Sequence, residues 1–250
     1  MDIFLIQVMP DILGGFFGAL FAFIFFIFGV RWQKKFELFL IIKKEHTHLE
    51  RYFNDLSRSV SENKFLLNSI LETFQEKSLP LISLRRLPIR EDITMRLADI
   101  AYINDVYKFM LKVDTINGDL ESSNNWRNKI CDSIEKYLLD QKREEFKTII
   151  ENSVKSFSEE SRALSGGLDM LLSVLKDLMA TNSYFLDYYK LNFLKRWYIR
   201  FCNKLSKKYK NKQNQKKVRI IQEARQRIES EFQATFDQDE EELKKFGIIK

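Results

Sequence analysis

The stretch from Ile12 to Val30 constrains this chain more than any other, because it contains no charged or strongly polar side chain. As a helix rising about 1.5 Å per residue it would be roughly 28 Å long, close to the ~30 Å hydrocarbon thickness of a bilayer. Seven of its residues are phenylalanines, and the rest of the chain is too polar to cover them on every side. We therefore predict a transmembrane helix within an anchor region of residues 1–30.

The residues that flank this stretch predict its orientation. The first thirty residues contain no Lys or Arg, and a positive cluster comes directly after them: Arg31, Trp32, Lys34 and Lys35. Positive charge stays on the cytoplasmic side and tryptophan settles at the interface, so we expect the N-terminus outside and residues 31–250 in the cytoplasm. A secretory signal peptide is the alternative, but residues 1–11 lack its basic segment. We therefore expect the chain to cross a membrane once.

Small residues recur every four positions inside the predicted span, at Gly14, Gly18 and Ala22. This spacing lets two helix backbones approach closely, so these residues are candidates for self-association into a homo-oligomer. The alternative is that glycine and alanine are simply common in membrane spans.

The rest of the sequence predicts an all-α fold. The whole chain is 30% charged and 45% hydrophobic, which suits a folded chain. The only prolines are Pro10, Pro80 and Pro88, and no run alternates as a strand would. We expect one N-terminal transmembrane helix that continues into an up-and-down bundle or coiled coil of long helices. Residues 31–210 form this cytoplasmic bundle, and residues 211–250 form a basic-to-acidic C-terminal helix or tail.

A heptad pattern predicts the first cytoplasmic helix. Mostly apolar residues recur in steps of three and four, as in a left-handed coiled coil or bundle seam: Phe39, Ile42, His46, Leu49, Phe53, Leu56, Val60, Asn63, Leu67, Ile70 and Phe74. The polar members His46 and Asn63 are candidates for fixing the register and the oligomeric state, since such residues meet their own kind in a seam. Replacing Asn63 by Leu would then keep or raise stability. Alternatively, each side chain rotates to a solvated rim.

Turn signals divide the chain after this helix into three further helices. Two prolines make Leu79–Arg90 a loop, which we expect to cross the end of the bundle. A helix then covers 91–118, its apolar positions being Ile93, Leu97, Ile100, Tyr107 and Leu111. The polar cluster from Asn117 to Asn125 predicts a turn before a helix over 126–157. Ser165-Gly166-Gly167 marks a turn or kink, and a second heptad pattern leads back toward the membrane: Leu164, Leu168, Leu171, Leu175, Leu178, Asn182, Phe185, Tyr189 and Asn192.

The stretch from Lys195 to Arg219 holds eleven Lys and Arg and no acidic residue. An apolar stripe runs through its start, formed by Leu191, Leu194, Tyr198, Phe201 and Leu205. This pattern is typical of a helix that lies on an anionic leaflet of the lipid bilayer. The candidate membrane-surface or phosphate-binding residues are Lys195, Arg196, Trp197, Arg200, Phe201, Lys204, Lys207 and Lys208. The alternatives are nucleic-acid binding through the same charges and a solvated helix end.

No motif indicates catalysis, a metal or a cofactor. The sequence lacks a phosphate-cradling glycine loop, a nucleophile motif and cysteines at metal spacing. His46 and His48 are two residues apart and do not share a helix face. We therefore expect a protein that is not an enzyme.

The layout of this chain resembles a diffuse group of bacterial single-pass, membrane-anchored helical proteins, some of which accompany phage-defence systems. The resemblance covers the N-terminal span, the long helix and a middle segment with Leu79-Pro80-Leu81, Tyr102-Ile103-Asn104 and Tyr107. It implies a self-assembling effector that perturbs or permeates the inner membrane. The alternative is a membrane-tethered scaffold that recruits a protein partner or nucleic acid.

Overall fold

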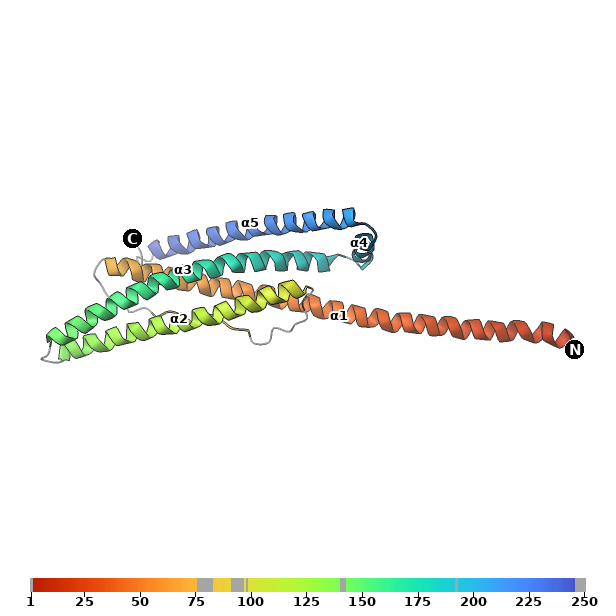
Figure 1. Cartoon of the computed structure of the whole chain (residues 1–250), viewed down its shortest axis with the longest axis horizontal. Coiled ribbons are helices and arrows are strands. Elements are labelled where there is room, and N and C mark those ends of the chain that lie inside the picture. The colour runs from red at the N-terminus through yellow and green to blue at the C-terminus, as the bar shows by residue number, and fades with distance from the viewer. Residues whose placement is uncertain are drawn as a thin grey trace. The chain divides into compact units, whose positions relative to one another are not determined.

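The computed structural model of the chain describes residues 2–75, 83–90, 97, 99–139, 143–191 and 193–245. These residues form five helices (Figure 1): α1 (Asp2–Gln75), α2 (Ile100–Leu139), α3 (Arg143–Lys190), α4 (Phe193–Leu205) and α5 (Lys207–Lys245). No strand occurs among them, so the predicted all-α class is confirmed. The chain divides into two compact units, an N-terminal unit of Met1–Lys44 and a C-terminal unit of Glu45–Lys250.

The N-terminal unit contains the apolar part of α1. Its phenylalanine side chains lie in the open, Phe25 being 73% exposed. This part of α1 is long and apolar enough to cross a membrane, with a mean hydropathy of 1.9 in its most apolar window and none of that window buried. Length and composition thus agree with the predicted span.

The second part of α1 carries the buried stripe that the heptad pattern predicted. Every heptad position from His46 to Ile70 is buried, and Phe53, Leu56, Val60 and Asn63 are fully enclosed. Phe39 and Ile42 are half-buried, and the side chain of Phe74 lies outside those described. Local periodicity was therefore enough to identify the core face of this helix.

The predicted turn at Asn117–Asn125 is wrong, and so is the turn alternative at Ser165-Gly166-Gly167, because α2 and α3 are longer than expected. The kink alternative stays a prediction. The cluster from Asn117 to Asn125 lies inside α2, and the Gly166-Gly167 pair lies inside α3. The predicted helix over 126–157 is in fact the end of α2 and the start of α3, whereas the predicted helix start near Glu91 lies outside the described residues. Gly167 serves close packing instead of a turn, since a Cβ there would come within 2.9 Å of Ile116 Cδ1.

The core face of α2 also differs from the prediction. Ile100, Tyr107 and Leu111 are exposed. The buried positions are offset around the helix, at Tyr102, Val106, Phe109, Val113, Ile116 and Leu120. Both sets recur at helical spacing, so periodicity alone did not decide between them.

The helix directions in the C-terminal unit differ from those of the predicted up-and-down bundle, in which each helix would be antiparallel to the one before it. His46 and Phe53 of α1 contact Tyr102 and Phe109 of α2, with ring centroids 5.9 and 6.1 Å apart, so α1 and α2 run parallel. α3 runs antiparallel to α1, because Lys64 pairs with Asp169 whereas His46 meets Asn182 further along α3. The helical bundle is thus confirmed, but its first two helices point the same way.

Because α1 and α2 run parallel, the segment that joins the end of α1 to the start of α2 must return along the length of the bundle. Residues 83–90 do so as an extended segment with Leu84 and Leu87 buried, and the expected crossing of the bundle end is wrong for this segment. Tyr52 near one end donates to the Pro88 carbonyl at 3.1 Å.

Three asparagine side chains hold this segment by its backbone. Each accepts from the N–H and donates to the C=O of one residue, at 2.7–3.0 Å: Asn63 holds Arg85, Asn117 holds Leu87, and Asn124 holds Leu84. An extended backbone among helices leaves polar groups that must be paired when buried, and these amides supply both partners. The polar residues that sequence reasoning assigned to a turn or an oligomer seam therefore form one internal clamp.

The last helix lies along α3 (Figure 1). Lys217 of α5 approaches the Phe185 ring, with 5.2 Å from Nζ to the centroid, and Glu229 pairs with Lys176 at 3.5 Å. The two helices are therefore antiparallel. The residues we expected to form a C-terminal helix or tail belong to this packed helix as far as Lys245.

Candidate membrane-surface site

Backbone breaks at both ends define α4 as a separate short helix. Leu191 N–H bonds the Tyr188 carbonyl at 3.3 Å after the end of α3. Ser206 separates α4 from α5, and its Oγ accepts from the Tyr209 N–H at 3.2 Å, as an N-cap does. α4 therefore follows α3 at the end of the C-terminal unit where Tyr189 packs on His46, with ring centroids 5.8 Å apart.

Three large apolar side chains of α4 point outward. Trp197 is 53% exposed, Phe201 47% and Leu205 70%. The Trp197 and Phe201 rings stack with centroids 5.3 Å apart and an angle of 13° between their planes. Residues four apart share a helix face, so this pair forms a flat apolar surface. The sequence predicted an apolar stripe, and the structure places its members Tyr198, Phe201 and Leu205 on the outside.

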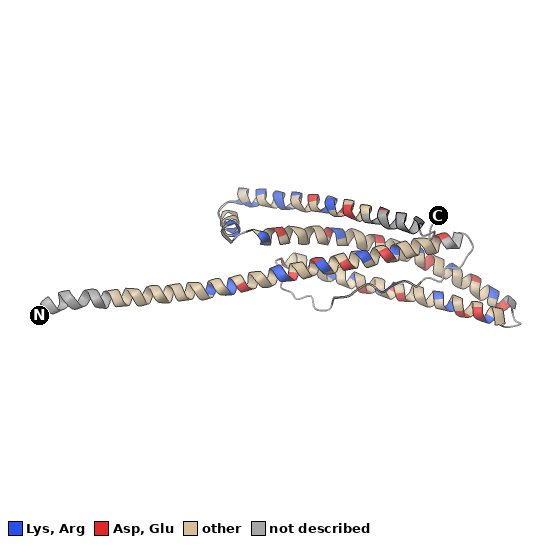
Figure 2. Ribbon diagram, turned by 180° about the vertical axis from the view of Figure 1, so that it is seen from behind, with Lys and Arg blue, Asp and Glu red and all other residues tan. Residues whose placement is uncertain are grey.

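The predicted basic residues surround this apolar surface. Exposed cations flank it on α4 and on the start of α5: Lys195, Arg200, Lys204, Lys207 and Lys208. Figure 2 shows Lys and Arg gathered on these two segments, with acidic residues appearing only later along α5. The structure thus brings all eight predicted surface residues together at one end of the C-terminal unit.

Arg196 differs from the other cations because it is half-buried. Its Cζ lies 6.0 Å from the centroid of the Tyr189 ring. Burial lowers the pKa of Arg196, and the positive charge of Arg200 lowers it further, while Tyr188 and Tyr189 oppose the shift. Burial raises the pKa of Tyr189, and Arg200 and Arg196 partly counter this. Sequence reasoning missed Tyr189 as a member of this site, because its heptad position indicated only a core residue.

His46 lies in a buried polar contact close to this site. Its Nδ1 and Asn182 Oδ1 are 2.7 Å apart, and Asn182 Nδ2 donates to the His46 carbonyl at 2.9 Å. Three rings surround the imidazole at 5.1–5.9 Å: Tyr102, Phe185 and Tyr189. Burial lowers the pKa of His46, whereas the Asn182 hydrogen bond and the charge of Glu45 raise it.

The two polar heptad residues, His46 and Asn63, therefore contact neither an identical residue nor solvent. His46 contacts Asn182 of α3, and Asn63 holds the backbone of Arg85. Both are fully enclosed within a single chain. Their hydrogen bonds serve the fold of one chain, which was neither of the two alternatives for them.

The small residues of the apolar stretch lie open. Gly14, Gly18 and Ala22 are exposed, and a Cβ built at Gly14 or Gly18 would meet no neighbouring atom within 4 Å. Their face is available for a second helix, and self-association through it remains a prediction.

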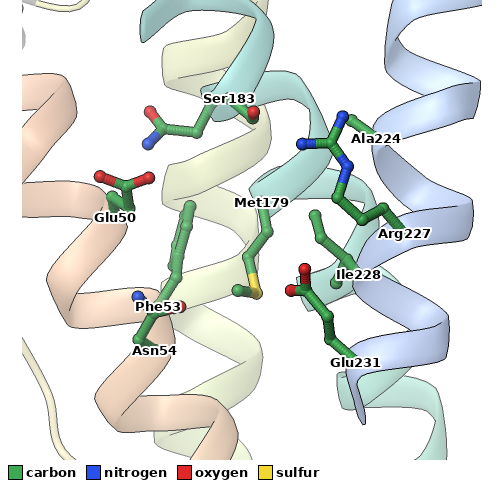
Figure 3. Close-up of a pocket in the computed structure, with 10 residues that line it drawn as sticks. Glu50, Phe53, Asn54, Met179, Ser183, Ala224, Arg227, Ile228 and Glu231 are labelled. Atoms are coloured by element: carbon green, nitrogen blue, oxygen red, sulfur yellow. The ribbon is translucent and has the colours of Figure 1, made fainter. Parts of the chain in front are cut away.

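A groove of about 210 Å³ lies over α3 between α1 and α5 (Figure 3). Phe53 and Met179 form apolar parts of its wall, and Glu50 faces it from α1 while Arg227 and Glu231 face it from α5. Its charged groups carry both signs and lie near solvent. The groove separates α1 from α5 at this level, so these two helices pack on α3 independently.

The described residues contain no group of three or more His, Cys, Asp or Glu that could hold a metal ion. No family model, curated protein or solved structure matches this chain. The surface of α4 and the apolar part of α1 are therefore the two features of the molecule that indicate a function.

Proposed function

We propose that this protein is a single-pass membrane protein, without enzymatic activity, which self-assembles and acts on the inner membrane through its cytoplasmic helical domain. The exposed face of α4 carries this proposal, because stacked aromatic rings and lysines or arginines share one short helix. Such a face binds an anionic leaflet by burying apolar surface and by attracting acidic headgroups. A solvated helix end does not need exposed Trp197 and Phe201 side chains.

The apolar part of α1 supports a second attachment to the same bilayer. Residues 31–44 connect the apolar stretch to Glu45, where the C-terminal unit begins. Within that unit, α4 lies at the end that holds His46, because Arg196 approaches Tyr189 and Tyr189 packs on His46. A short tether of this kind raises the effective concentration of α4 near the leaflet.

Self-assembly is supported by the open small-residue face of Gly14, Gly18 and Ala22. A membrane-perturbing role in phage defence rests on the resemblance in layout to bacterial membrane-anchored helical proteins. A span without a polar stripe favours a hydrophobic gate over a permanently hydrated channel. The expected orientation, with the C-terminus in the cytoplasm, is tested by fusing a reporter active only in the cytoplasm after Lys250.

Fluorescence of Trp197 in the full chain tests the membrane contact. The other tryptophans are replaced (Trp32→Phe, Trp126→Phe), and the protein is placed in nanodiscs of phosphatidylcholine alone or mixed with phosphatidylglycerol. We expect brominated acyl chains to quench Trp197 when anionic lipid is present. Changing Lys195, Arg196, Arg200 and Lys204 to Gln removes about 1 kcal/mol per charge, so the quenching is lost.

The matched control changes four exposed lysines elsewhere, Lys108, Lys112, Lys136 and Lys147, to Gln. This variant loses the same total charge and should keep the quenching. If Trp197 is not quenched in anionic nanodiscs but the protein binds oligonucleotides with a steep salt dependence, the membrane contact is wrong and the tethered scaffold for nucleic acid is the better function.

Exchange of both Gly14 and Gly18 for Leu tests self-assembly. Larger side chains keep the two backbones apart, so the mass of the detergent-solubilised particle should fall. An unchanged mass would show that another surface directs assembly.

A further inference from the structure

Two arginine–aromatic pairs repeat at a spacing of four residues on α4, Arg196-Trp197 and Arg200-Phe201. The spacing places both arginines on one side of the helix and both rings on the neighbouring side. Trp197 and Phe201 are in contact, with stacked rings. Arg196 Cζ lies 6.0 Å from the centroid of the Tyr189 ring at the end of α3, and Arg200 follows about one helical turn later on the same side of α4.

An anion bound between the two guanidinium groups would reduce the repulsion between them. Like charges four residues apart destabilise a helix by a few tenths of a kcal/mol, and Arg196 is also half-buried. No acidic residue occurs from Tyr188 to Gln222. The preceding carboxylate, Asp187, pairs with Lys190 at 2.9 Å. α4 and its flanking turns therefore carry no carboxylate of their own.

The chemistry of the site fits a phosphate that belongs to a lipid. A guanidinium group donates two parallel hydrogen bonds to a phosphate, which a lysine cannot copy. The stacked aromatic pair beside it is exposed and apolar, and aromatic rings settle at the headgroup level of a bilayer. An anionic phospholipid offers a phosphate and an apolar chain in this arrangement, whereas free phosphate uses only the arginines.

We infer that Arg196 and Arg200 form a binding site for the phosphate of an anionic phospholipid, with Trp197 and Phe201 contacting the acyl region below it. This inference rests on the proposed membrane function. It adds that recognition depends on guanidinium geometry as well as on net charge.

The charge-preserving double variant Arg196→Lys, Arg200→Lys separates these two contributions. It is made in the full chain with Trp197 as the single tryptophan, and quenching is titrated against the mole fraction of phosphatidylglycerol. We expect the half-saturating fraction to rise about tenfold, equivalent to about 1.4 kcal/mol. A lysine-to-arginine exchange away from this surface, Lys108→Arg with Lys112→Arg on the exposed side of α2, is the control and should leave the titration unchanged.

The outcomes are distinguishable. If the Arg-to-Lys variant binds like the parent protein, the phosphate site is wrong and attraction by net charge alone explains binding, so the proposed function survives. If the parent protein itself shows no quenching, the proposed function fails first. Inorganic phosphate is the competitor: displacement of the lipid at an equal phosphate concentration would identify a free-anion site and overturn the lipid assignment. Unchanged Trp197 emission in detergent verifies that both variants keep the fold.

Discussion

α3 is bounded by two helices that are held to it by different forces. Towards α1 (Glu45 onward), α3 presents an apolar stripe including Leu171 and Leu175, and α1 contributes Phe53 and Leu56, all essentially inaccessible to solvent. Towards α5, charged side chains take part in most of the contacts: Arg225 pairs with Asp177 at 2.9 Å, Lys176 pairs with Glu229 at 3.5 Å, and Lys217 lies against the Tyr184 and Phe185 rings. Among the described side chains of α5, Ala224 is the buried one.

This difference predicts that α1, α2 and α3 form a stable core, whereas α5 is bound to it more weakly. Burial of one large apolar side chain contributes about 1.5–3 kcal/mol, and salt hardly affects it. An exposed ion pair contributes about 0.2–1 kcal/mol and is screened by salt. We therefore expect α1, α2 and α3 to unfold together, and α5 with α4 to open locally at lower cost.

The largest effect is expected inside the α1 stripe. Phe53→Ala should lower the free energy of unfolding by about 3–5 kcal/mol, because it leaves a cavity where Phe53 packs on Phe109. Urea unfolding of the full chain in one detergent, followed by circular dichroism, measures the change. Tyr107→Ala, on the exposed face of α2, is the control. If both variants lowered the free energy of unfolding equally, the buried stripe of α1 would not be the core of the bundle.

Asn63→Leu tests whether the polar members of this interface also stabilise it. The change removes the fully buried Asn63 amide that pairs with the N–H and C=O of Arg85, so we expect a loss of about 2–4 kcal/mol. This reverses the expectation drawn from the heptad pattern alone, in which leucine was neutral or favourable. The exposed Asn104→Leu should change the same unfolding free energy by less than about 0.5 kcal/mol. A stabilised Asn63→Leu protein would contradict the clamp.

His46 makes the α1 side of α3 sensitive to pH. Its pKa is lowered from 6.5 by burial, so an unfolded chain binds the proton at a pH where the folded chain does not. Neutral His46 therefore contributes stability above about pH 6.5, which is lost as the pH falls through the folded pKa. The groups that face it are Glu45, Asn182, Tyr102 and Tyr189, of which the Glu45 carboxylate favours the protonated ring without outweighing burial. Urea midpoints from about pH 7 to pH 5 should fall, and His46→Gln should flatten that fall. Parallel curves for the two proteins would dismiss His46 as the cause.

The smallest effect is expected on the α5 side. Arg225→Gln removes a pair with Asp177 that is about half exposed, so α5 should lose no more than about 1 kcal/mol of docking stability. Hydrogen exchange in α5 should accelerate, and raising the salt concentration should act in the same direction, while exchange in α3 near Leu171 stays slow. Arg219→Gln is the matched control, since Arg219 pairs with Glu223 inside α5 at 2.7 Å. Salt-independent exchange in α5 would remove the contrast between the two sides.

Sequence reasoning reached furthest where the relevant contacts are local. The apolar length of Ile12–Val30, the seam from His46 to Ile70 and the second seam from Leu164 to Tyr189 depend on residues three or four apart, so periodicity exposes them. The amphipathic character of α4 is local in the same way. Turn signals were less reliable, because both residue types also occur inside packed helices. The Asn117 amide pairs with the Leu87 backbone, and Gly167, which lacks a side chain, allows close contact with Ile116.

The amino-acid sequence by itself determined that this protein is helical, which faces of α1 and α3 are apolar, and where the basic aromatic segment lies. Tertiary structure alone decided that α1 and α2 run parallel, that three asparagines hold an extended segment, and that Trp197 and Phe201 face outward. The physical reason is distance along the chain: a helix forms from neighbours four residues away, whereas Asn63 meets Arg85 and His46 meets Asn182 only after the path of the backbone has brought them together.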